Sequence, residues 1–380
     1  MVRFSSSPIS IFPSDVPVWI VGGAVRDLLS HKAPSDWDLV AQMDVKDISK
    51  ATGGKVVGPE GKQVCVFSLS GSVIEIGSLD GRSIESDLAR RDFTVNAMAI
   101  DRHGRILDPF GGQKDLSLKR LRFVPELEDR LRDDPVRALR FCRFAATLGL
   151  MPMKDELCRL ARFVQDNHGP FGAIPLERVG REMSKGLAFP EAFLETLGLA
   201  GLRELFLPSI ELKGRPIPTG PIDLALSLGL LGFMSDSERI FDLALSWGVP
   251  SRTRKYGLRY GSVLRALSGS MSLLEAVKLL PLFDELRSDR LMELLLLGCT
   301  GNGLWKDGLD KLDTARSALE RASQRGIPLS GGEIASITGP GPHVGPCLDM
   351  MIRKVLCDPY LSPEDARSSI VAYCKKTDER

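Results

Sequence analysis

Residues 18–27 read VWIVGGAVRD, an apolar run that passes through two glycines into a helical pattern. Such a run predicts a strand, and the glycines mark its turn into the helix that follows. Glycines at this junction let a ligand approach the backbone, and the free N–H groups at the start of the helix can bind a phosphate. Paired glycines also occur in ordinary turns, and their spacing here does not fit a dinucleotide-binding fingerprint. The stretch therefore predicts a strand–turn–helix unit with a candidate phosphate site at Gly22 and Gly23, to which Arg26 would add a charge-assisted contact.

Two carboxylates begin the next apolar strand, in the sequence DWD at 36–38. Asp36 and Asp38 lie two residues apart, so both side chains project from one face of the strand. Carboxylates side by side repel each other unless a cation bridges them, and with no His or Cys nearby Mg²⁺ is the natural choice. Glu75, within another apolar run, is placed to supply a third catalytic carboxylate from an adjacent strand. The alternative is that Glu75 lies on the solvent side of an edge strand.

Strand and helix patterns alternate up to about residue 125, which indicates an α/β domain. The expected strands are Val18–Val21, Asp38–Ala41, Val64–Leu69 and Ser72–Ile76, and the expected helices between them are Ala24–Leu29 and Ser86–Met98. From about Asp133 onward the apolar residues recur with a period of about 3.6. This pattern predicts helices within 135–148, 177–186, 224–231, 273–280, 289–297 and 313–325. With 380 residues, the chain fits several domains, and we expect an α/β head followed by an all-helical remainder.

The charge composition does not by itself point to nucleic acid, because the net charge at pH 7 is only +1. A nucleic-acid partner would require the positive charge to be concentrated locally. Between Asp242 and Glu275 there is no acidic residue. The candidate RNA-binding residues in this stretch are Arg252, Arg254, Lys255 and Arg259, with Tyr256 and Tyr260 among them. A solvated basic surface is the equally weighted alternative.

The cysteines and the apolar runs indicate a soluble protein of a reducing compartment. The 7 cysteines occur singly, without a CxxC pair, and no apolar leader precedes them. A disulfide framework or a zinc site is therefore not expected, and we expect a cytoplasmic protein. The longest apolar runs, Leu224–Met234 and Leu291–Cys299, are too short to span a bilayer, so no membrane partner is expected.

A helical stretch farther along carries a row of arginines. Residues 133–146 read DDPVRALRFCRFAA, in which Arg137, Arg140 and Arg143 recur every three residues. They occupy an arc of about 120° on a helix. Three converging arginines would be costly to hold together without anions nearby. The row therefore indicates that anions lie nearby.

Five motifs in this order, GGAVRD, DWD, RRDFTVNAMA, DPFGG and DDPVRALRFCRFAA, resemble the bacterial class II tRNA nucleotidyltransferase and poly(A) polymerase family. LER at 176–178 and GPGPHVG at 339–345 resemble later motifs of that family, so the resemblance covers nearly the whole chain. It implies an α/β nucleotidyltransferase head (mixed sheet with helices) followed by an all-α neck, body and tail. The implied boundaries are 1–125 for the head with the catalytic site, 126–190 for the neck with base recognition, 191–270 for the body, and 271–380 for the tRNA-binding tail.

The resemblance also implies a role for each matching residue. Asp36 and Asp38 would hold catalytic Mg²⁺, and the nucleotide triphosphate would be bound by Gly22, Gly23, Arg26 and Arg91, with Asn96 nearby. Asp134 and Arg137 would read the base, and Arg140 and Arg143 would support the nucleotide from the same helix. An Asp acceptor beside an Arg donor can pair with the hydrogen-bonding edge of cytosine or adenine. We therefore expect transfer of CMP, and also AMP in a complete CCA-adding enzyme, from CTP and ATP to the tRNA 3′ end by two-metal chemistry without a nucleic-acid template.

Two departures from the family pattern matter. Asp133 stands where Glu is usual, and only sixteen residues separate Glu75 from Asp92. Full CCA-adding members carry a longer loop there, often with an arginine after the strand, whereas here Asp80 and Gly81 follow Leu79. The shortening resembles the CC-adding branch, so we expect addition of CC. The alternatives are complete CCA addition, addition of A alone, a poly(A) polymerase, or a non-catalytic tRNA-binding protein.

Overall fold

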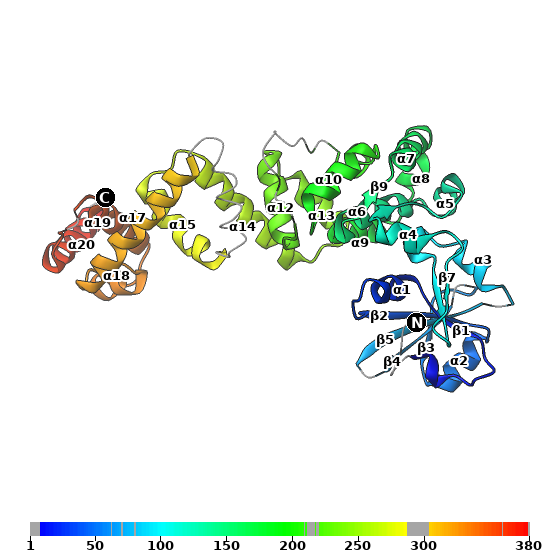
Figure 1. Ribbon diagram of the computed structural model, residues 1–380. Helices are drawn as coiled ribbons and strands as arrows, with labels where there is room; N and C mark the ends of the chain where they lie inside the picture. Colours follow the sequence, from blue (N-terminus) through cyan, green and yellow to red (C-terminus); the bar gives the residue numbers. More distant parts are fainter. Residues whose placement is uncertain are drawn as a thin grey trace. The chain divides into compact units, whose positions relative to one another are not determined.

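The computed structural model describes residues 8–61, 63–69, 71–79, 81–208, 210, 217, 220–286, 304–358 and 360–378. The chain divides into two compact units, each of which is described by itself (Figure 1). Unit 1 comprises Met1–Ser209, Thr219–Pro221 and Ser246–Gly248, and unit 2 comprises Ile210–Pro218, Ile222–Leu245 and Val249–Arg380. Asp80, Cys299 and the helix expected within 289–297 lie outside the described residues.

A seven-stranded sheet with the strand order β3-β4-β5-β2-β1-β6-β7 forms the first part of unit 1. Its strands are β1 (Val18–Val21), β2 (Asp36–Ala41), β3 (Lys55–Val57), β4 (Val64–Leu69), β5 (Ser72–Ser78), β6 (Ala99–Asp101) and β7 (Ile106–Leu107). The pairing of β2 with β5 is parallel and the other pairings are antiparallel. The expected mixed sheet is therefore confirmed.

Both faces of this sheet carry buried side chains. Successive side chains along each strand point to opposite faces. On one face Ile20 and Leu39 are buried with side chains of α1 (Gly22–Leu29) and α2 (Val45–Thr52). On the other face Val21 and Val40 are buried with α3 (Ile84–Leu88). Asp36 and Asp38 share the second face with Val40, at the end of β2 where the strand becomes exposed.

The helix expected over Ser86–Met98 is wrong. Only α3 is helical; a short turn of 3₁₀ helix, η2 (Thr94–Asn96), and then β6 follow it. Phe93 pairs with Phe123 in an isolated bridge, and the backbone of Thr94 donates to the carbonyl of Arg122. Nearly every side chain from Phe93 to Ile100 is buried, so this segment has no solvent face. A helix would expose one face and would lose the backbone pairing with residues 122–124.

The rest of unit 1 is helical apart from one small parallel strand pair, β8 (Arg120–Leu121) with β9 (Met151–Pro152). The helices are α4 (Gly112–Ser117), α5 (Leu127–Asp133), α6 (Val136–Leu148), α7 (Lys154–Asp166), α8 (His168–Gly172), α9 (Leu176–Gly186), α10 (Pro190–Leu199) and α11 (Arg203–Phe206), after η1 (Pro8–Ile11) at the start of the chain. Helix α6 begins after Pro135, ends at Gly149 with a φ of +60°, and packs on α9 and α10. This packing brings Arg140 and Arg143 of α6 close to Glu182 of α9.

Unit 2 consists of helices in the part of the chain that the structure describes. They are α12 (Leu224–Met234), α13 (Arg239–Ser246, whose last residue belongs to unit 1), α14 (Ser251–Ser268), α15 (Leu273–Leu286), α17 (Leu304–Gln324), α18 (Gly331–Thr338), α19 (Val344–Cys357) and α20 (Pro363–Asp378). One core joins α12, α14, α15 and α17, and a second joins α17 to α18, α19 and α20. The expected fold class, an α/β head followed by helices, is confirmed, whereas the four-part division of the chain stays a prediction. Among the described residues, every helix falls short of the length and apolar character that crossing a membrane requires.

Candidate active site

The turn between β1 and α1 brings a carboxylate and a guanidinium against the backbone. Gly22 has a φ of +69°, and a Cβ atom there would lie 2.9 Å from Asp38 Oδ2 and 2.9 Å from Arg91 Nη1. A side chain at this position would collide with both groups, so their approach requires glycine. The backbone N–H of Gly23 donates a hydrogen bond to the Asp38 carboxylate. Gly22, Gly23, Asp38 and Arg91 thus meet at the start of α1, where the sequence predicts a phosphate site.

The carboxylates of Asp36, Asp38 and Glu75 influence one another. The register of β2 against β5 places Asp38 opposite Glu75, and β5 lies inside the sheet, so Glu75 is not on an edge strand. Burial raises the pKa of Asp38, and the charge of Asp36 adds to this effect, while Arg91 opposes it. Burial also raises the pKa of Glu75, and the charges of Asp38 and Asp36 raise it further. Burial is therefore the main cause of both raised pKa values, and the neighbouring carboxylates add to it.

The donor set fits a magnesium ion that is shared with a bound phosphate. Within the described residues, no cluster of three His, Cys, Asp or Glu side chains is arranged to hold a metal ion. Mg²⁺ is usually bound through one or two carboxylates together with waters and substrate phosphates, and it does not need an all-protein cage. Asp36 and Asp38 suit this role, and the contribution of Glu75 stays a prediction.

Arg91 is fixed by Asp87, to which the sequence reasoning gave no role. The Asp87 carboxylate on α3 accepts hydrogen bonds from Arg91 Nε at 3.2 Å and Nη2 at 2.9 Å. The remaining nitrogen, Nη1, is the atom that approaches Gly22. The i, i+4 spacing of an acid and a base was the available signal in the sequence.

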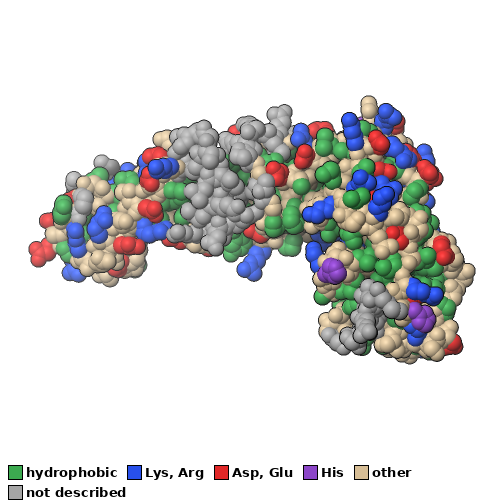
Figure 2. Space-filling model, viewed as in Figure 1, with side chains coloured by type: hydrophobic (Ala, Val, Ile, Leu, Met, Phe, Trp, Pro, Cys, Tyr) green, Lys and Arg blue, Asp and Glu red, His purple; other side chains and the backbone are tan. Residues whose placement is uncertain are grey.

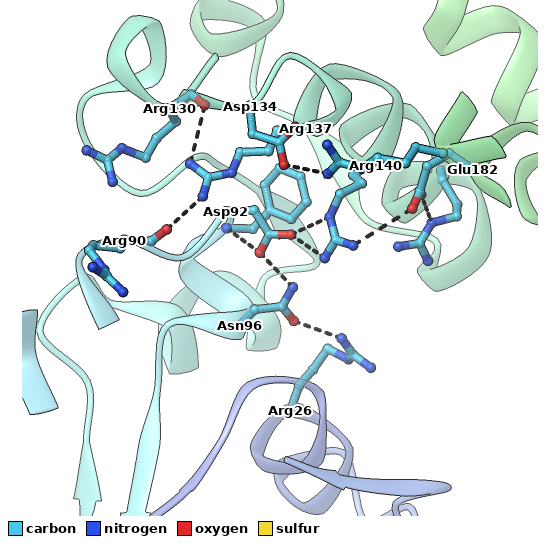
Figure 3. Close-up of polar contacts among 12 residues, drawn as sticks. Arg26, Arg90, Asp92, Asn96, Arg130, Asp134, Arg137, Arg140 and Glu182 are labelled. Carbon is cyan, nitrogen blue, oxygen red and sulfur yellow. Dashed lines mark hydrogen bonds and ion pairs between the residues drawn. The ribbon is translucent and has the colours of Figure 1, made fainter. Parts of the chain in front are cut away.

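A chain of hydrogen bonds joins α1 to α6 through the RRDFTVNAMA motif (Figure 3). Arg26 Nη1 donates to Asn96 Oδ1 at 2.8 Å, and Asn96 Nδ2 donates to Asp92 Oδ1 at 3.1 Å. Asp92 Oδ2 accepts from Arg140 Nε and Nη2 at 2.8 and 2.6 Å. Burial acts to raise the pKa of Asp92, but the charge of Arg140 and the hydrogen bonds from Asn96, Arg140 and the Phe93 N–H outweigh it, so the pKa is lowered. Asp92 is therefore an ionised, buried link between the two helices.

Three arginines surround the ring of Phe144 on α6. The guanidinium carbons of Arg26, Arg140 and Arg143 lie 5.6, 5.5 and 4.2 Å from the ring centroid. Arg143 also donates to Glu182 of α9, and Arg140 Nη1 lies 3.8 Å from the same carboxylate. The aromatic face and the buried carboxylates hold these cations in place. The structure thus brings together three of the predicted nucleotide-binding arginines.

Asp134 and Arg137, the predicted base-reading residues, have separate partners. Arg178 of α9 donates to Asp134 Oδ2 at 2.7 Å. Arg137 Nη2 donates to the backbone carbonyl of Arg90 at 2.8 Å, and its Nη1 donates to the carbonyl of Arg130 at 3.3 Å. Arg137 therefore does not join the arginines around Phe144, in contrast to the expected convergence of the row, because two backbone carbonyls bind its guanidinium.

Parts of this chain are similar in sequence to known proteins. Residues 18–66 and 62–122 match the poly A polymerase head domain. A multifunctional CCA protein of Vibrio cholerae serotype O1 is 35% identical over 222 residues, which cover 53% of this chain and 54% of that protein. A CCA-adding enzyme of Geobacillus thermodenitrificans is 35% identical over 214 residues, 52% of each chain. The chain thus spans about half the length of the curated relatives it matches.

Solved structures extend the likeness along the chain. The Bacillus stearothermophilus CCA-adding enzyme in complex with CTP has a TM-score of 0.67 and is 25% identical, with 96% of this chain and 95% of that chain covered. Residues 18–122 thus resemble the poly A polymerase head domain, and the fold resembles that of a CCA-adding enzyme. The Thermotoga maritima CCA-adding enzyme complexed with tRNA shares the fold, with a TM-score of 0.66 and 21% identity over 95% of this chain and 92% of that chain.

Helix α9 carries two partners of the candidate site that sequence reasoning missed. Arg178 binds Asp134, and Glu182, four residues later, binds Arg143. Glu182 is buried although it is charged, which requires a partner. The spacing on a helix was visible in the sequence, but the partners on α6 depend on how the two helices pack.

The predicted RNA-binding residues lie in the amino-terminal half of α14. Arg252 and Arg259 approach the ring of Tyr256, at 5.8 and 5.6 Å from its centroid. Arg252 and Lys255 are exposed, whereas Arg254 donates to the Val249 carbonyl and Arg259 is paired with Glu285 of α15. An open depression is lined by Ser251, Arg252, Lys255, Tyr256, Leu258 and Arg259. On the face drawn in Figure 2, basic and acidic side chains are interspersed over the helices of unit 1. Binding of RNA phosphates requires clustered basic side chains, and the residues of α14 are the candidates.

Proposed function

We propose that this chain is a template-independent tRNA nucleotidyltransferase that transfers CMP from CTP to the 3′ end of tRNA. The observation that carries the proposal is that α1 joins two sets of contacts. At its start Gly22 approaches Asp38 and Arg91, and from its Arg26 a chain of hydrogen bonds runs through Asn96 and Asp92 to Arg140 on α6. A phosphate site and a base-reading helix are thereby held in one unit. The CCA-adding relatives and the CTP complex of a structural neighbour support the same activity.

The residues around the turn are suited to bind and orient the triphosphate. Gly22 and Gly23 let the phosphates approach the backbone at the start of α1, and Arg26, Arg91, Arg140 and Arg143 offset their negative charge. Asp36 and Asp38 would hold Mg²⁺ between protein and phosphate, with Glu75 as the third carboxylate. When two metal ions are bound, one would lower the pKa of the attacking tRNA hydroxyl and the other would stabilise the leaving pyrophosphate.

Selection of the base rests on Asp134 and Arg137. A guanidinium has five N–H donors, and the carbonyls of Arg90 and Arg130 occupy only two of those of Arg137. The remaining donors and the Asp134 carboxylate can pair with the polar edge of a cytosine. Arg178 would hold the acceptor in place, as the backbone carbonyls hold the donor.

The product we propose is CC, with the final A added by another enzyme. The connection between β5 and α3 consists only of residues 79–83, and Leu79 and Ile84 at its two sides are buried. Arg82 N–H donates to the Leu79 carbonyl at 2.9 Å. A connection of this length leaves little chain to move the base-reading residues between two nucleotides.

Complete CCA addition is the second candidate, because the curated relatives are named for it. One experiment separates the two functions. Transcripts of tRNA that end before CCA, after C and after CC are incubated with CTP, ATP and Mg²⁺, and the products are sized. We expect the first two to stop at CC and the third to remain unchanged. The absence of any extension would overturn the enzymatic proposal itself.

A further inference from the structure

Arg130 on α5 lies between the segment 84–92 and the predicted base-reading residues. Its Nη1 donates to the backbone carbonyl of Ala89 at 3.1 Å, and only 17% of the side chain is exposed. Its Nε is buried, with no hydrogen-bond partner among the described residues. Burying a guanidinium N–H without a hydrogen-bond partner costs free energy, and the contact with Ala89 only partly offsets it.

The backbone carbonyl of Arg130 contacts both base-reading residues. It accepts a hydrogen bond from the N–H of Asp134 at 3.2 Å and another from Arg137 Nη1 at 3.3 Å. Arg137 Nη2 in turn donates to the carbonyl of Arg90, which follows Ala89 in the chain. Figure 3 shows Arg137 between the two carbonyls.

These contacts form a closed ring. The ring runs from Arg137 to the Arg90 carbonyl, through the peptide to the Ala89 carbonyl, to the Arg130 side chain, and from the Arg130 carbonyl back to Arg137. Both acceptors that orient Arg137 are backbone atoms, and the Arg130 side chain ties them to each other. Without that side chain the ring is open, and the two carbonyls can move apart.

We propose that Arg130 is a positioning residue that sets nucleotide selectivity by fixing Arg137, an inference that rests on the proposed function. A bidentate contact to a base requires its donors to be held within about 0.5 Å of the productive position. Arg130 acts through Arg137, because its own Nη1 is directed at Ala89 and lies 3.9 Å from Asp133. Its loss lowers discrimination between bases and leaves the phosphate site around Gly22 intact.

The test compares Arg130→Met and Arg130→Lys with Arg132→Met as the matched control. Arg132 is on the same helix, but its side chain is 64% exposed and forms an ion pair with Asp129. The ratio of kcat/KM for CTP to that for UTP is measured on a tRNA that ends before CCA. We expect Arg130→Met to lower this ratio by about 5-fold or more, the lower end of what one bidentate base contact supplies. Lys can still donate one hydrogen bond to Ala89, so Arg130→Lys should restore most of the ratio, and Arg132→Met should match the wild type.

A double mutant distinguishes positioning from a general structural role. If Arg130 acts through Arg137, adding Arg130→Met to Arg137→Ala changes the ratio no further. Arg130→Gln is made in parallel, with the same expectations, in case Arg130→Met does not fold. Equal losses of kcat/KM for CTP and UTP in the Met or Gln variant would overturn the inference. Additive effects in the double mutant would overturn it as well. In both cases, incorporation of CTP by the wild type would still uphold the proposed function. A wild-type protein that incorporates no nucleotide would overturn both.

Discussion

The carboxylate of Asp92 accepts hydrogen bonds from two nitrogens of Arg140, at 2.8 and 2.6 Å, and so ties the RRDFTVNAMA segment to helix α6. Asp92 is buried, and Asn96 and the Phe93 N–H donate to its other oxygen. A buried carboxylate with this many donors cannot be neutralised without leaving charge uncompensated. The fold therefore depends on the charge of Asp92.

Asp92→Asn should destabilise the protein by about 3–5 kcal/mol, because it leaves the Arg140 charge without its main partner. Thermal or urea unfolding of both proteins measures the loss. Asp129→Asn, which removes an exposed carboxylate paired with Arg132, is the control and should change stability by less than about 1 kcal/mol. Equal stability of the wild type and Asp92→Asn would show that the pair contributes nothing.

The same residue predicts a pH dependence. The folded-state pKa of Asp92 is lowered, so its contribution is fully present above the unfolded pKa of about 3.9 and is lost as the pH falls through the folded value. The difference in melting temperature between wild type and Asp92→Asn should therefore be constant from pH 7 to about pH 5 and should shrink below about pH 4. A difference that already shrinks between pH 7 and 5 would mean that burial raises the pKa instead.

Asp36→Asn or Asp38→Asn should lower turnover by several orders of magnitude, with tRNA affinity nearly unchanged. Each change removes negative charge from the face of β2 where Mg²⁺ and phosphate would bind. Single-turnover incorporation of CMP and a filter-binding titration with tRNA measure the two quantities. Asp47→Asn, on the exposed side of α2, should behave as wild type. Normal incorporation by both site variants would remove these residues from the catalytic assignment.

Asp134→Ala or Arg137→Ala should relax the choice among nucleotides, since one bidentate base contact is worth about 1–3 kcal/mol of selectivity. Incorporation of UTP and GTP is compared with that of CTP. Arg178→Ala should cause a smaller change in the same direction, because it leaves Asp134 in place without its partner. If incorporation of all nucleotides falls equally and the preference for CTP is kept, α6 binds the triphosphate and does not read the base.

Local spacing was enough to predict the centre of the site from the sequence. Two carboxylates at i and i+2 must share one strand face, and a strand that ends in two glycines before a helix must turn sharply, whatever surrounds them. The same holds for the apolar periodicity that predicted α6. These features depend on neighbours in the chain, so Asp36, Asp38 and the Gly22 turn could be named before the structure was known.

Tertiary packing decided the features that the sequence did not reveal. Residues 86–98 carry a helix-like apolar pattern, but residues 92–98 are buried and residues 92–94 pair with residues 122–124. The pairing of Asp134 with Arg178, and of Arg137 with the Arg90 carbonyl, joins segments that are distant in the chain. Periodicity has no information about such contacts, because it reports only which side of an element is apolar.

Replacing Arg252, Arg254 and Lys255 with alanine should weaken tRNA binding and flatten its salt dependence. Each phosphate that the protein no longer neutralises reduces the slope of log K against log salt concentration by about 1. Arg254 already donates to the Val249 carbonyl, so Arg252 and Lys255 should account for most of the change. A triple alanine variant of the exposed residues Lys46, Lys50 and Lys55 removes the same charge elsewhere and should leave the slope near that of the wild type. Equal slopes in the wild type and both variants would show that the basic side chains of α14 are a solvated surface that does not bind tRNA.

A tRNA that ends in CC, incubated with ATP and Mg²⁺, should remain unextended. Addition of A after CC requires one pocket to accept first a pyrimidine and then a larger purine, so Asp134 and Arg137 must shift to meet a new hydrogen-bonding edge. Here residues 79–83 are the whole connection between β5 and α3. Arg90, two residues after the end of α3, accepts a hydrogen bond from Arg137 through its carbonyl. A tRNA that ends before CCA, incubated with CTP alone, is the control for active enzyme and should gain CC. Efficient addition of one A to the CC-ending tRNA would show that this short connection still permits the switch, with Arg82 as the residue to replace next.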